Sequence, residues 1–451
     1  MDLIKLLLAL AFLLSACAAN PAGTDAASIL AEADEPAPPC PQPAAQVAPM
    51  ARSEVAGAAR GLALSPAPVA KPVPAPSAAP RSSLDAIAGR ATARIGTGSR
   101  APANPIAAPS QVATGPVTAG LVDDNERWGD YLAYRRRAGG FDVREREVEG
   151  RIVVEVRDAQ GRPVHDALVE AGGAQMRTDS AGRALFHPHA NGRSQERRWL
   201  IAARKHGLTT SAVADLGQSN NVRLLLAAPR DKTVRLDLLF LIDTTGSMAD
   251  EIDRLRGTMD VIVKDIARNT RPDIRYGLVH YRDRGDEYVV RSHAFTPSLR
   301  SFRQDLACLR ANGGGDYPES LNLGLHTAVH QMAWRDEETV RMVILIADAP
   351  PHLDYRDEPF DYAQDMTHAA TKGIKIFPIG ASGLNAQGEY IFRQMAQFTG
   401  GKFVFLTYAD RNRPGEAPGV ETSHDVRDYS VDNLDRIVVR LVSEELRPLR
   451  D

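Results

Sequence analysis

The stretch that most constrains this chain is a continuous apolar run, Leu238–Ile242, followed directly by Asp243-Thr244-Thr245-Gly246-Ser247. Apolar residues at every position of so short a run are typical of a strand buried on both faces, as in a parallel sheet. Asp243, Thr245 and Ser247 alternate, so an extended or turning backbone can aim their three side-chain oxygens into one crevice. Small divalent cations prefer such hard oxygen ligands, and open α/β sheets bind ligands at the carboxyl ends of their strands. We therefore expect a cation site at the carboxyl edge of a parallel sheet.

The sequence after Arg235 alternates between strand and helix patterns, which predicts a doubly wound, mostly parallel α/β sheet. Met342–Ala347 is a second buried strand, and it also ends in an acid, Asp348. Between the two strands lies a glycine-rich loop, Gly313–Glu319, whose glycines let the backbone turn sharply and approach closely. Two buried strands that both end in aspartate, with Asp316 in the loop between them, argue against a chance arrangement.

These motifs resemble the von Willebrand factor A domain, whose metal-ion-dependent adhesion site carries Asp-x-Ser/Thr-x-Ser after its first strand. The resemblance covers Arg235 to the C-terminus, roughly half of the chain. It implies that Asp348 belongs to a metal loop in which an aspartate holds the cation directly or through water. Another loop of the family usually supplies a threonine, and Asp316 is the nearest oxygen donor here. The implied ligands are Asp243, Thr245, Ser247, Asp316 and Asp348, with Mg²⁺ as the expected ion and Mn²⁺ or Ca²⁺ as the other candidates.

Residues on neighbouring loops are candidates for the rim of this site, where a partner would be contacted. Asp283, for example, follows the strand Ile274–Tyr281, whose carboxyl end should lie on the same edge of the sheet. The candidate rim residues are Asp283, Tyr317, Glu319 and His352.

Two further histidines, His326 and His330, lie four residues apart and so share one face of the helix that follows the glycine loop. Such spacing can bind zinc, but the glutamate of a His-Glu-x-x-His protease is missing. We interpret the two histidines as surface or packing residues.

Residues 124–230 have the pattern of a short helix followed by an all-β module. Trp128, Tyr131 and Leu132 recur at helical spacing, and short alternating runs separated by turns follow from Gly150. This pattern predicts a small β-sandwich. The run from Val154 to Phe186 resembles the carboxypeptidase-regulatory-like, transthyretin-type sandwich, which implies a spacer or recognition module without catalysis.

The first residues have the pattern of an exported lipoprotein. Lys5 precedes the apolar run Leu6–Leu14, which is too short to span a bilayer as a helix and suits a secretory signal. The run closes with Leu14-Ser15-Ala16-Cys17, which resembles a bacterial lipobox and implies cleavage before Cys17 and acylation there; an ordinary signal peptide is the alternative. Ala18 stands where the inner-membrane retention aspartate would be, which favours a lipid anchor in the outer membrane, facing the periplasm.

The segment from Ala18 to about Gly120 is rich in Ala, Pro, Ser and Gly, and it cannot bury enough apolar surface to fold. Three cysteines are too few for a disulfide framework, and we expect Cys40 and Cys308 to stay unpaired. The predicted parts of the chain are a signal peptide (1–16), a Pro/Ala-rich disordered tether (17–123), a short helix with the β-sandwich (124–230) and the von Willebrand factor A domain (231–451).

The function implied by these features is protein binding in a bacterial cell envelope. The formal net charge is −3, so the chain lacks the excess of basic residues that is typical of nucleic-acid-binding proteins. A cation that keeps an exchangeable water can accept a carboxylate from an envelope or extracellular protein. A metal-dependent hydrolase is the enzyme alternative, but the sequence lacks a Gly-x-Ser-x-Gly elbow and paired catalytic acids near the metal loops. A metal-free scaffold of an envelope complex is the third interpretation, supported by the missing loop threonine. We expect a binding module that is not an enzyme.

Overall fold

A computed structural model of the chain describes residues 40, 43, 45–47, 117–190, 198–215, 220–230, 233–270, 273–410 and 418–450. The predicted signal peptide, Cys17 and most of the predicted tether lie outside the described residues. Among the helices in these ranges, none is long and apolar enough to cross a membrane.

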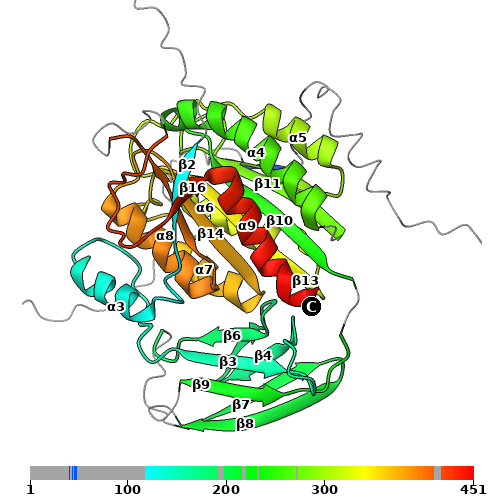
Figure 1. Ribbon diagram of the computed structural model, residues 1–451. Coiled ribbons are helices and arrows are strands. Elements are labelled where there is room, and N and C mark those ends of the chain that lie inside the picture. The colour runs from blue at the N-terminus through cyan, green and yellow to red at the C-terminus, as the bar shows by residue number, and fades with distance from the viewer. Residues whose placement is uncertain are drawn as a thin grey trace, which may run out of the picture. The chain divides into compact units, whose positions relative to one another are not determined.

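The described residues include a nine-stranded sheet in the order β1-β12-β11-β10-β13-β14-β15-β2-β16 (Figure 1). Five neighbouring strands of this sheet run parallel, in the spatial order β11, β10, β13, β14 and β15. Antiparallel strands flank them on both sides. The doubly wound, mostly parallel sheet predicted from the sequence is therefore confirmed. The strands are β1 (Ala45–Val47), β2 (Thr118–Val122), β10 (Arg235–Asp243), β11 (Asp273–Tyr281), β12 (Val290–Thr296), β13 (Thr339–Ala347), β14 (Ile374–Gly380), β15 (Phe403–Thr407) and β16 (Val431–Asn433).

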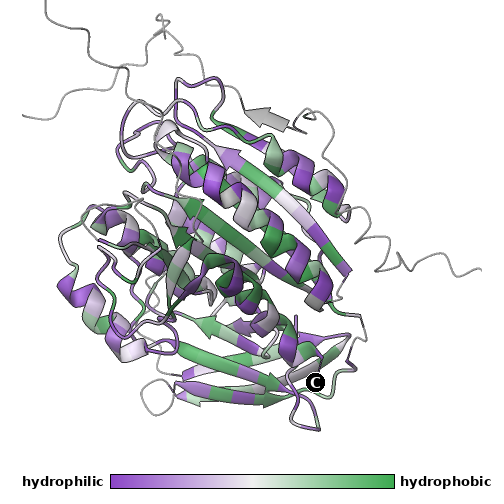
Figure 2. Cartoon of the chain, turned by 45° about the horizontal axis from the view of Figure 1, so that its top comes forward, coloured by the Kyte–Doolittle hydropathy of each residue, from purple (hydrophilic) through white to green (hydrophobic). Residues whose placement is uncertain are grey.

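Helices cover both faces of this sheet. On one face α4, α5 and α9 form a core in which Ile262 packs with Phe240 of the central strand. On the other face α6, α7 and α8 form a second core that contains Leu325 and Leu241. Figure 2 shows the hydrophobic central strands and the hydrophilic residues along the helices that cover them. The helices are α3 (Trp128–Arg137), α4 (Ala249–Thr270), α5 (Leu299–Ala307), α6 (Leu321–His326), α7 (Tyr362–Thr371), α8 (Ala386–Thr399) and α9 (Leu434–Leu446), with short turns η1 (Gly246–Met248), η2 (Thr327–Gln331) and η3 (Arg447–Leu449).

The predicted end of the tether differs from the structure. The predicted tether extends to residue 123, but Thr118–Val122 form β2, which pairs antiparallel with β15. Gly120, which fits the small-residue composition of the predicted tether, has a packing role here, because a Cβ atom at this position would lie 2.3 Å from the Phe405 ring. Val431–Asn433 also pair with β2, as β16, and α9 begins directly after them at Leu434.

A disulfide joins Cys40 to Cys308, so the expectation that these cysteines stay unpaired is wrong. Cys308 is the C-cap of α5, and the nearby β1 pairs antiparallel with β12. The two cysteines are 268 residues apart in sequence, so only the folded chain brings them together. Part of the predicted tether is therefore attached to the edge of the sheet.

The β-sandwich has a three-stranded sheet, β6-β3-β9, and a four-stranded sheet, β5-β4-β7-β8, among the described residues. Alternate strand residues such as Val154, Val169 and Ile201 are buried together in its own core. The predicted all-β sandwich is therefore confirmed. Its strands are β3 (Ile152–Arg157), β4 (Leu168–Ala171), β5 (Ala174–Arg177), β6 (Arg183–Phe186), β7 (Arg198–Lys205), β8 (Leu208–Asp215) and β9 (Asn221–Leu225).

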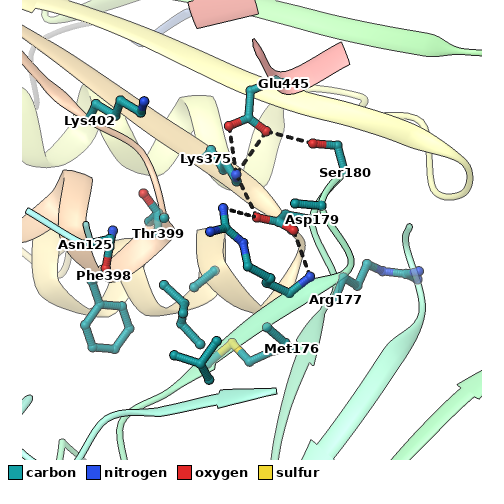
Figure 3. A pocket seen from close by; sticks show the side chains of 18 of the residues that line it. Asn125, Met176, Arg177, Asp179, Ser180, Lys375, Phe398, Thr399, Lys402 and Glu445 are labelled. Carbon is teal, nitrogen blue, oxygen red and sulfur yellow. Dashed lines mark hydrogen bonds and ion pairs between the residues drawn. The ribbon is translucent and has the colours of Figure 1, made fainter. Parts of the chain in front are cut away.

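Buried ion pairs attach the sandwich to the α/β domain. Arg341 on β13 pairs with Asp166 at 3.1 Å, and both side chains are buried. Lys375 on β14 pairs with Asp179 at 2.9 Å and with Glu445 on α9 at 2.8 Å. Figure 3 shows Lys375 between these two carboxylates, in the wall of a cavity of about 570 Å³. The sandwich and the α/β domain therefore belong to one compact unit.

Candidate metal site

The first loop of the site follows β10. Its residues form hydrogen bonds with Asp243, the last residue of that strand. The backbone N–H and the hydroxyl of Thr245 both donate to Asp243 Oδ1, at 2.9 and 2.7 Å. The Ser247 hydroxyl lies 3.2 Å from the Thr245 hydroxyl. Asp243 and Thr245 are fully buried. The alternating Asp-x-Thr-x-Ser sequence thus brings three oxygen-bearing side chains together.

A second acid reaches the same edge from the neighbouring strand. β13 pairs parallel with β10, with Ile346 opposite Ile242, so Asp348 follows its strand where Asp243 ends the other. Asp348 is 4% exposed. Burial raises the pKa of its carboxyl group, and the hydrogen bond from the Ser247 hydroxyl opposes this rise, which places the two loops against each other. The structure therefore brings Asp243, Thr245, Ser247 and Asp348 together, as their positions at strand ends predict.

The glycine-rich loop closes over these residues at very short range. The Gly246 N–H donates to the Gly313 carbonyl at 2.9 Å. Gly314 has a φ of +71°, and a Cβ atom there would lie 2.9 Å from both Thr245 Cβ and Glu319 Oε1. Only glycine fits this left-handed, crowded position without strain. The loop therefore presents Glu319 to the Asp243 loop.

Glu319 lies inside the site and is 3% exposed, whereas the sequence analysis places it on the rim. Its backbone explains the difference: the Glu319 N–H donates to the Pro350 carbonyl, and the His352 N–H donates to the Glu319 carbonyl, both at 3.1 Å. This bridge ties Glu319 to the turn after Asp348. A glutamate is almost never buried without a partner, so Glu319 is the functional residue whose role sequence reasoning misses.

Like charges meet in this small volume. Burial, and then the charge of Asp348, raises the pKa of Asp243 to about 7. Burial also raises the pKa of Asp348 to about 6. For Glu319, burial first and the Asp243 charge second raise the pKa to about 9. A cation would relieve both the desolvation and the mutual repulsion of these carboxylates.

Each of these three carboxyl groups has one buried oxygen with no hydrogen-bond partner among the described residues. The three atoms are Asp243 Oδ2, Asp348 Oδ1 and Glu319 Oε2. Buried polar atoms are normally satisfied, so three unpartnered carboxyl oxygens in neighbouring loops call for an explanation. The chemistry of these donors, carboxyl oxygens with the hydroxyls of Thr245 and Ser247 between the loops, fits a cation that takes oxygen ligands and water.

The remaining predicted site residues form a neighbouring cluster. Ligand atoms of Asp283, Asp316 and His352 lie within 4.8 Å of one another, and the carboxyl group of Asp316 is exposed. Asp283 and His352 are each 2% exposed, so their side chains lie inside the loops and not on the exposed rim where the sequence analysis places them. The Ser320 hydroxyl donates to Asp283 Oδ1 at 2.7 Å. Tyr317, by contrast, is 45% exposed.

A further residue that the sequence analysis does not assign to the site, Asp286, holds these loops in place. Its Oδ2 accepts from the N–H of Asp283 at 3.1 Å and from the N–H of Gly314 at 2.9 Å. A carboxylate in a tight turn such as Arg284-Gly285-Asp286 commonly bonds nearby backbone N–H groups, which is the signal that could have suggested this role.

The fold and the site together define a class: a doubly wound α/β domain with an all-oxygen candidate cation site at the carboxyl edge of its sheet. Residues 237–359 match the family model described as von Willebrand factor A domain, and this part of the chain is such a domain. A domain of this family fits a protein-interaction module.

Two curated proteins are similar to part of this chain. An alpha-protein kinase, vwkA, from Dictyostelium discoideum is 33% identical over 123 residues, which are 26% of this chain and 19% of the kinase. A putative ariadne-like RING finger protein of Acanthamoeba polyphaga mimivirus is 28% identical over 192 residues, 39% of this chain and 19% of that protein. The chain thus spans about a fifth of the length of each relative. Among solved structures, the open conformation of the pilus adhesin SpaC from Lactobacillus rhamnosus GG aligns with a TM-score of 0.30 and 12% identity, covering 56% of this chain and 32% of the adhesin.

Proposed function

We propose that this chain is an envelope-anchored module that binds a partner protein through a divalent cation at the carboxyl edge of its sheet. The observation that carries the proposal is the set of three buried, unpartnered carboxyl oxygens beside the hydroxyls of Thr245 and Ser247. All of these donors are oxygens, which suits Mg²⁺ best, with Mn²⁺ or Ca²⁺ as substitutes in a test.

Asp243, Thr245, Ser247 and Asp348 would hold the ion, and Glu319 would face it from the glycine loop. The bound ion supplies a position that can accept a carboxylate from the partner. Asp316 is exposed beside the buried Asp283 and His352, so we place Asp316 at the partner-facing rim. The exposed Tyr317 adds an aromatic contact surface of the kind that protein interfaces favour.

We favour binding over catalysis because of where the hydroxyl groups point. Thr245 donates to Asp243, and Ser247 lies against Thr245. Both hydroxyls lie among the carboxyl groups that would hold the ion, where a hydroxyl oxygen can serve as a ligand to a cation.

The disulfide supports the location in the envelope, because such bonds form and persist in oxidising compartments such as the periplasm. The lipobox-like Leu14-Ser15-Ala16-Cys17 would supply the lipid anchor in the outer membrane. We propose that the sandwich is a spacer of the carboxypeptidase-regulatory-like type.

The test is crosslinking in native envelopes, with the intact chain compared with Asp243→Ala in magnesium and in chelator. We expect protein crosslinks that require magnesium and disappear in Asp243→Ala, whereas a control at an exposed ion pair, Glu155→Gln, keeps them. Identical crosslinks in all three proteins would contradict cation-dependent capture. Anchoring is tested separately: Cys17→Ser should move the protein to the soluble fraction, and a membrane-bound Cys17→Ser chain would contradict the lipid anchor.

A further inference from the structure

A second cluster of metal-ligating side chains lies on the helices α6, η2 and α7, away from the carboxyl-edge site. His326 ends α6, His330 lies in η2, and Asp365 lies in the first turn of α7. His326 Nδ1 is 3.3 Å and His330 Nε2 is 2.9 Å from Asp365 Oδ1. His368, one turn further along α7, has its Nδ1 3.9 Å from the same oxygen.

The carboxyl group at the centre of this cluster is not satisfied by its histidines. Asp365 is 3% exposed, and its Oδ2 is a buried atom without a hydrogen-bond partner among the described residues. All three ring nitrogens that approach the carboxyl group do so at Oδ1. A buried carboxylate with one crowded oxygen and one unpartnered oxygen, surrounded by imidazoles, is the kind of donor set that a metal ion completes.

The distances match the spacing of ligands around one ion. Metal–nitrogen and metal–oxygen bonds of roughly 2.0–2.2 Å in a tetrahedron separate neighbouring ligand atoms by about 3.3 Å. The ligand atoms of His326, His330 and Asp365 lie within 4.8 Å of one another. The rings of His326 and His330 stack with centroids 4.6 Å apart, and His368 meets His330 edge-on at 4.9 Å.

The local backbone and solvent access also suit a site. η2 is a π-turn, in which the Met332 N–H reaches back to the Thr327 carbonyl. Such turns are rare and often lie at functional positions. The side chains of His326 and His330 are about a quarter exposed, so an ion can enter.

We propose that His326, His330, Asp365 and His368 form a binding site for a divalent transition metal of the zinc class, which clamps α6 and η2 to α7. Imidazole nitrogens with a single carboxylate suit Zn²⁺ or Co²⁺ and not Mg²⁺ or Ca²⁺, which prefer all-oxygen sites. The site is separate from the carboxyl-edge site, because Glu319 lies in the loop before α6, whereas His326 ends that helix. The proposal does not depend on the proposed function.

The experiment is a zinc titration of the full chain after treatment with chelator, followed by calorimetry and by thermal unfolding. We expect one zinc ion per chain and a higher melting temperature. Replacing even outer-shell partners of a metal weakens its binding by about 10–100-fold, so His330→Ala and Asp365→Asn should each weaken zinc binding at least about tenfold. His206→Ala is the matched control, because His206 is a part-exposed histidine beside one carboxylate, Glu338, at 3.2 Å.

Asp243→Ala separates the two sites, since it should leave zinc binding intact. His368→Ala tests the site without disturbing the core, because this side chain is 54% exposed and its loss creates no core cavity. It too should weaken zinc binding, and Co²⁺ bound to the wild-type chain should show the visible absorption of a tetrahedral site that this variant loses. Zinc affinity within about twofold of wild type in His330→Ala, Asp365→Asn and His368→Ala would overturn the proposal, and so would its loss in Asp243→Ala.

Discussion

At the scale of single residues, the carboxyl-edge site gathers three buried carboxyl groups, each of which has a raised pKa. Asp243 Oδ1 accepts two hydrogen bonds from Thr245, whereas Asp243 Oδ2 has none. The pKa of Asp243 is about 7 because ionising it costs desolvation and repulsion from Asp348. The metal-free protein therefore carries an electrostatic penalty at neutral pH that a cation removes.

This penalty predicts that Asp243→Asn stabilises the metal-free protein. The amide keeps the oxygen that accepts from Thr245 and turns a donor toward the other carboxylates. Because the folded-state pKa lies above the ordinary value of 3.8, the wild-type free energy of unfolding falls as pH rises from about 4 through about 7. The variant lacks this fall, so its advantage should grow to roughly 2–4 kcal/mol at pH 8.

Urea unfolding at pH 5 and pH 8 in chelator measures this difference. The variant should also lose its stabilisation by magnesium. A variant that is less stable than wild type at pH 8 would contradict the electrostatic account of Asp243.

At the scale of elements, strand ends and helices follow from the sequence, while long-range contacts do not. Asp243 and Asp348 could be predicted as neighbours, since both follow apolar runs of buried parallel strands. Glu319 could not, because its burial depends on a backbone bridge to Pro350 that no local pattern encodes. The strand β2 could not be predicted either, because Gly120 is required by its close packing against Phe405, which is far away in the sequence.

The disulfide between the segment before β1 and the end of α5 gives a prediction at this scale. Cys308→Ser should lower the free energy of unfolding by about 2–4 kcal/mol, the usual contribution of a disulfide. Cys40→Ser should have the same effect, and the double variant should add little, because all three remove one bond. Denaturant unfolding measures the stability, and thiol titration of the denatured chain checks the bond. Free thiols at both positions in protein purified under oxidising conditions would show that the disulfide is absent.

At the scale of the whole molecule, the sandwich is attached to the α/β domain by ion pairs that depend on pH. The pKa of Asp179 is lowered to about 2, against burial, chiefly by the charge of Lys375. A lowered folded-state pKa contributes stability above the ordinary value of 3.8, and this contribution is lost as pH falls toward about 2. Asp179→Asn should therefore cost about 2 kcal/mol at pH 7 and almost nothing near pH 2.

Unfolding of wild type and Asp179→Asn between pH 7 and pH 2 tests this attachment. Glu155→Gln, at the exposed pair with Arg223, is the matched control and should stay within about 0.5 kcal/mol of wild type. A difference between wild type and Asp179→Asn that does not change with pH would mean that Asp179 acts through packing and not through its charge.

The central claim is that a divalent cation binds among Asp243, Thr245, Ser247, Asp348 and Glu319. The most direct measurement is the melting temperature of the chelator-treated chain as magnesium is added, for wild type, Asp243→Ala and His330→Ala. Ligand binding to the folded state should raise the melting temperature of wild type and His330→Ala with increasing magnesium and leave that of Asp243→Ala unchanged. The same rise in Asp243→Ala, or no rise in wild type, would contradict the claim.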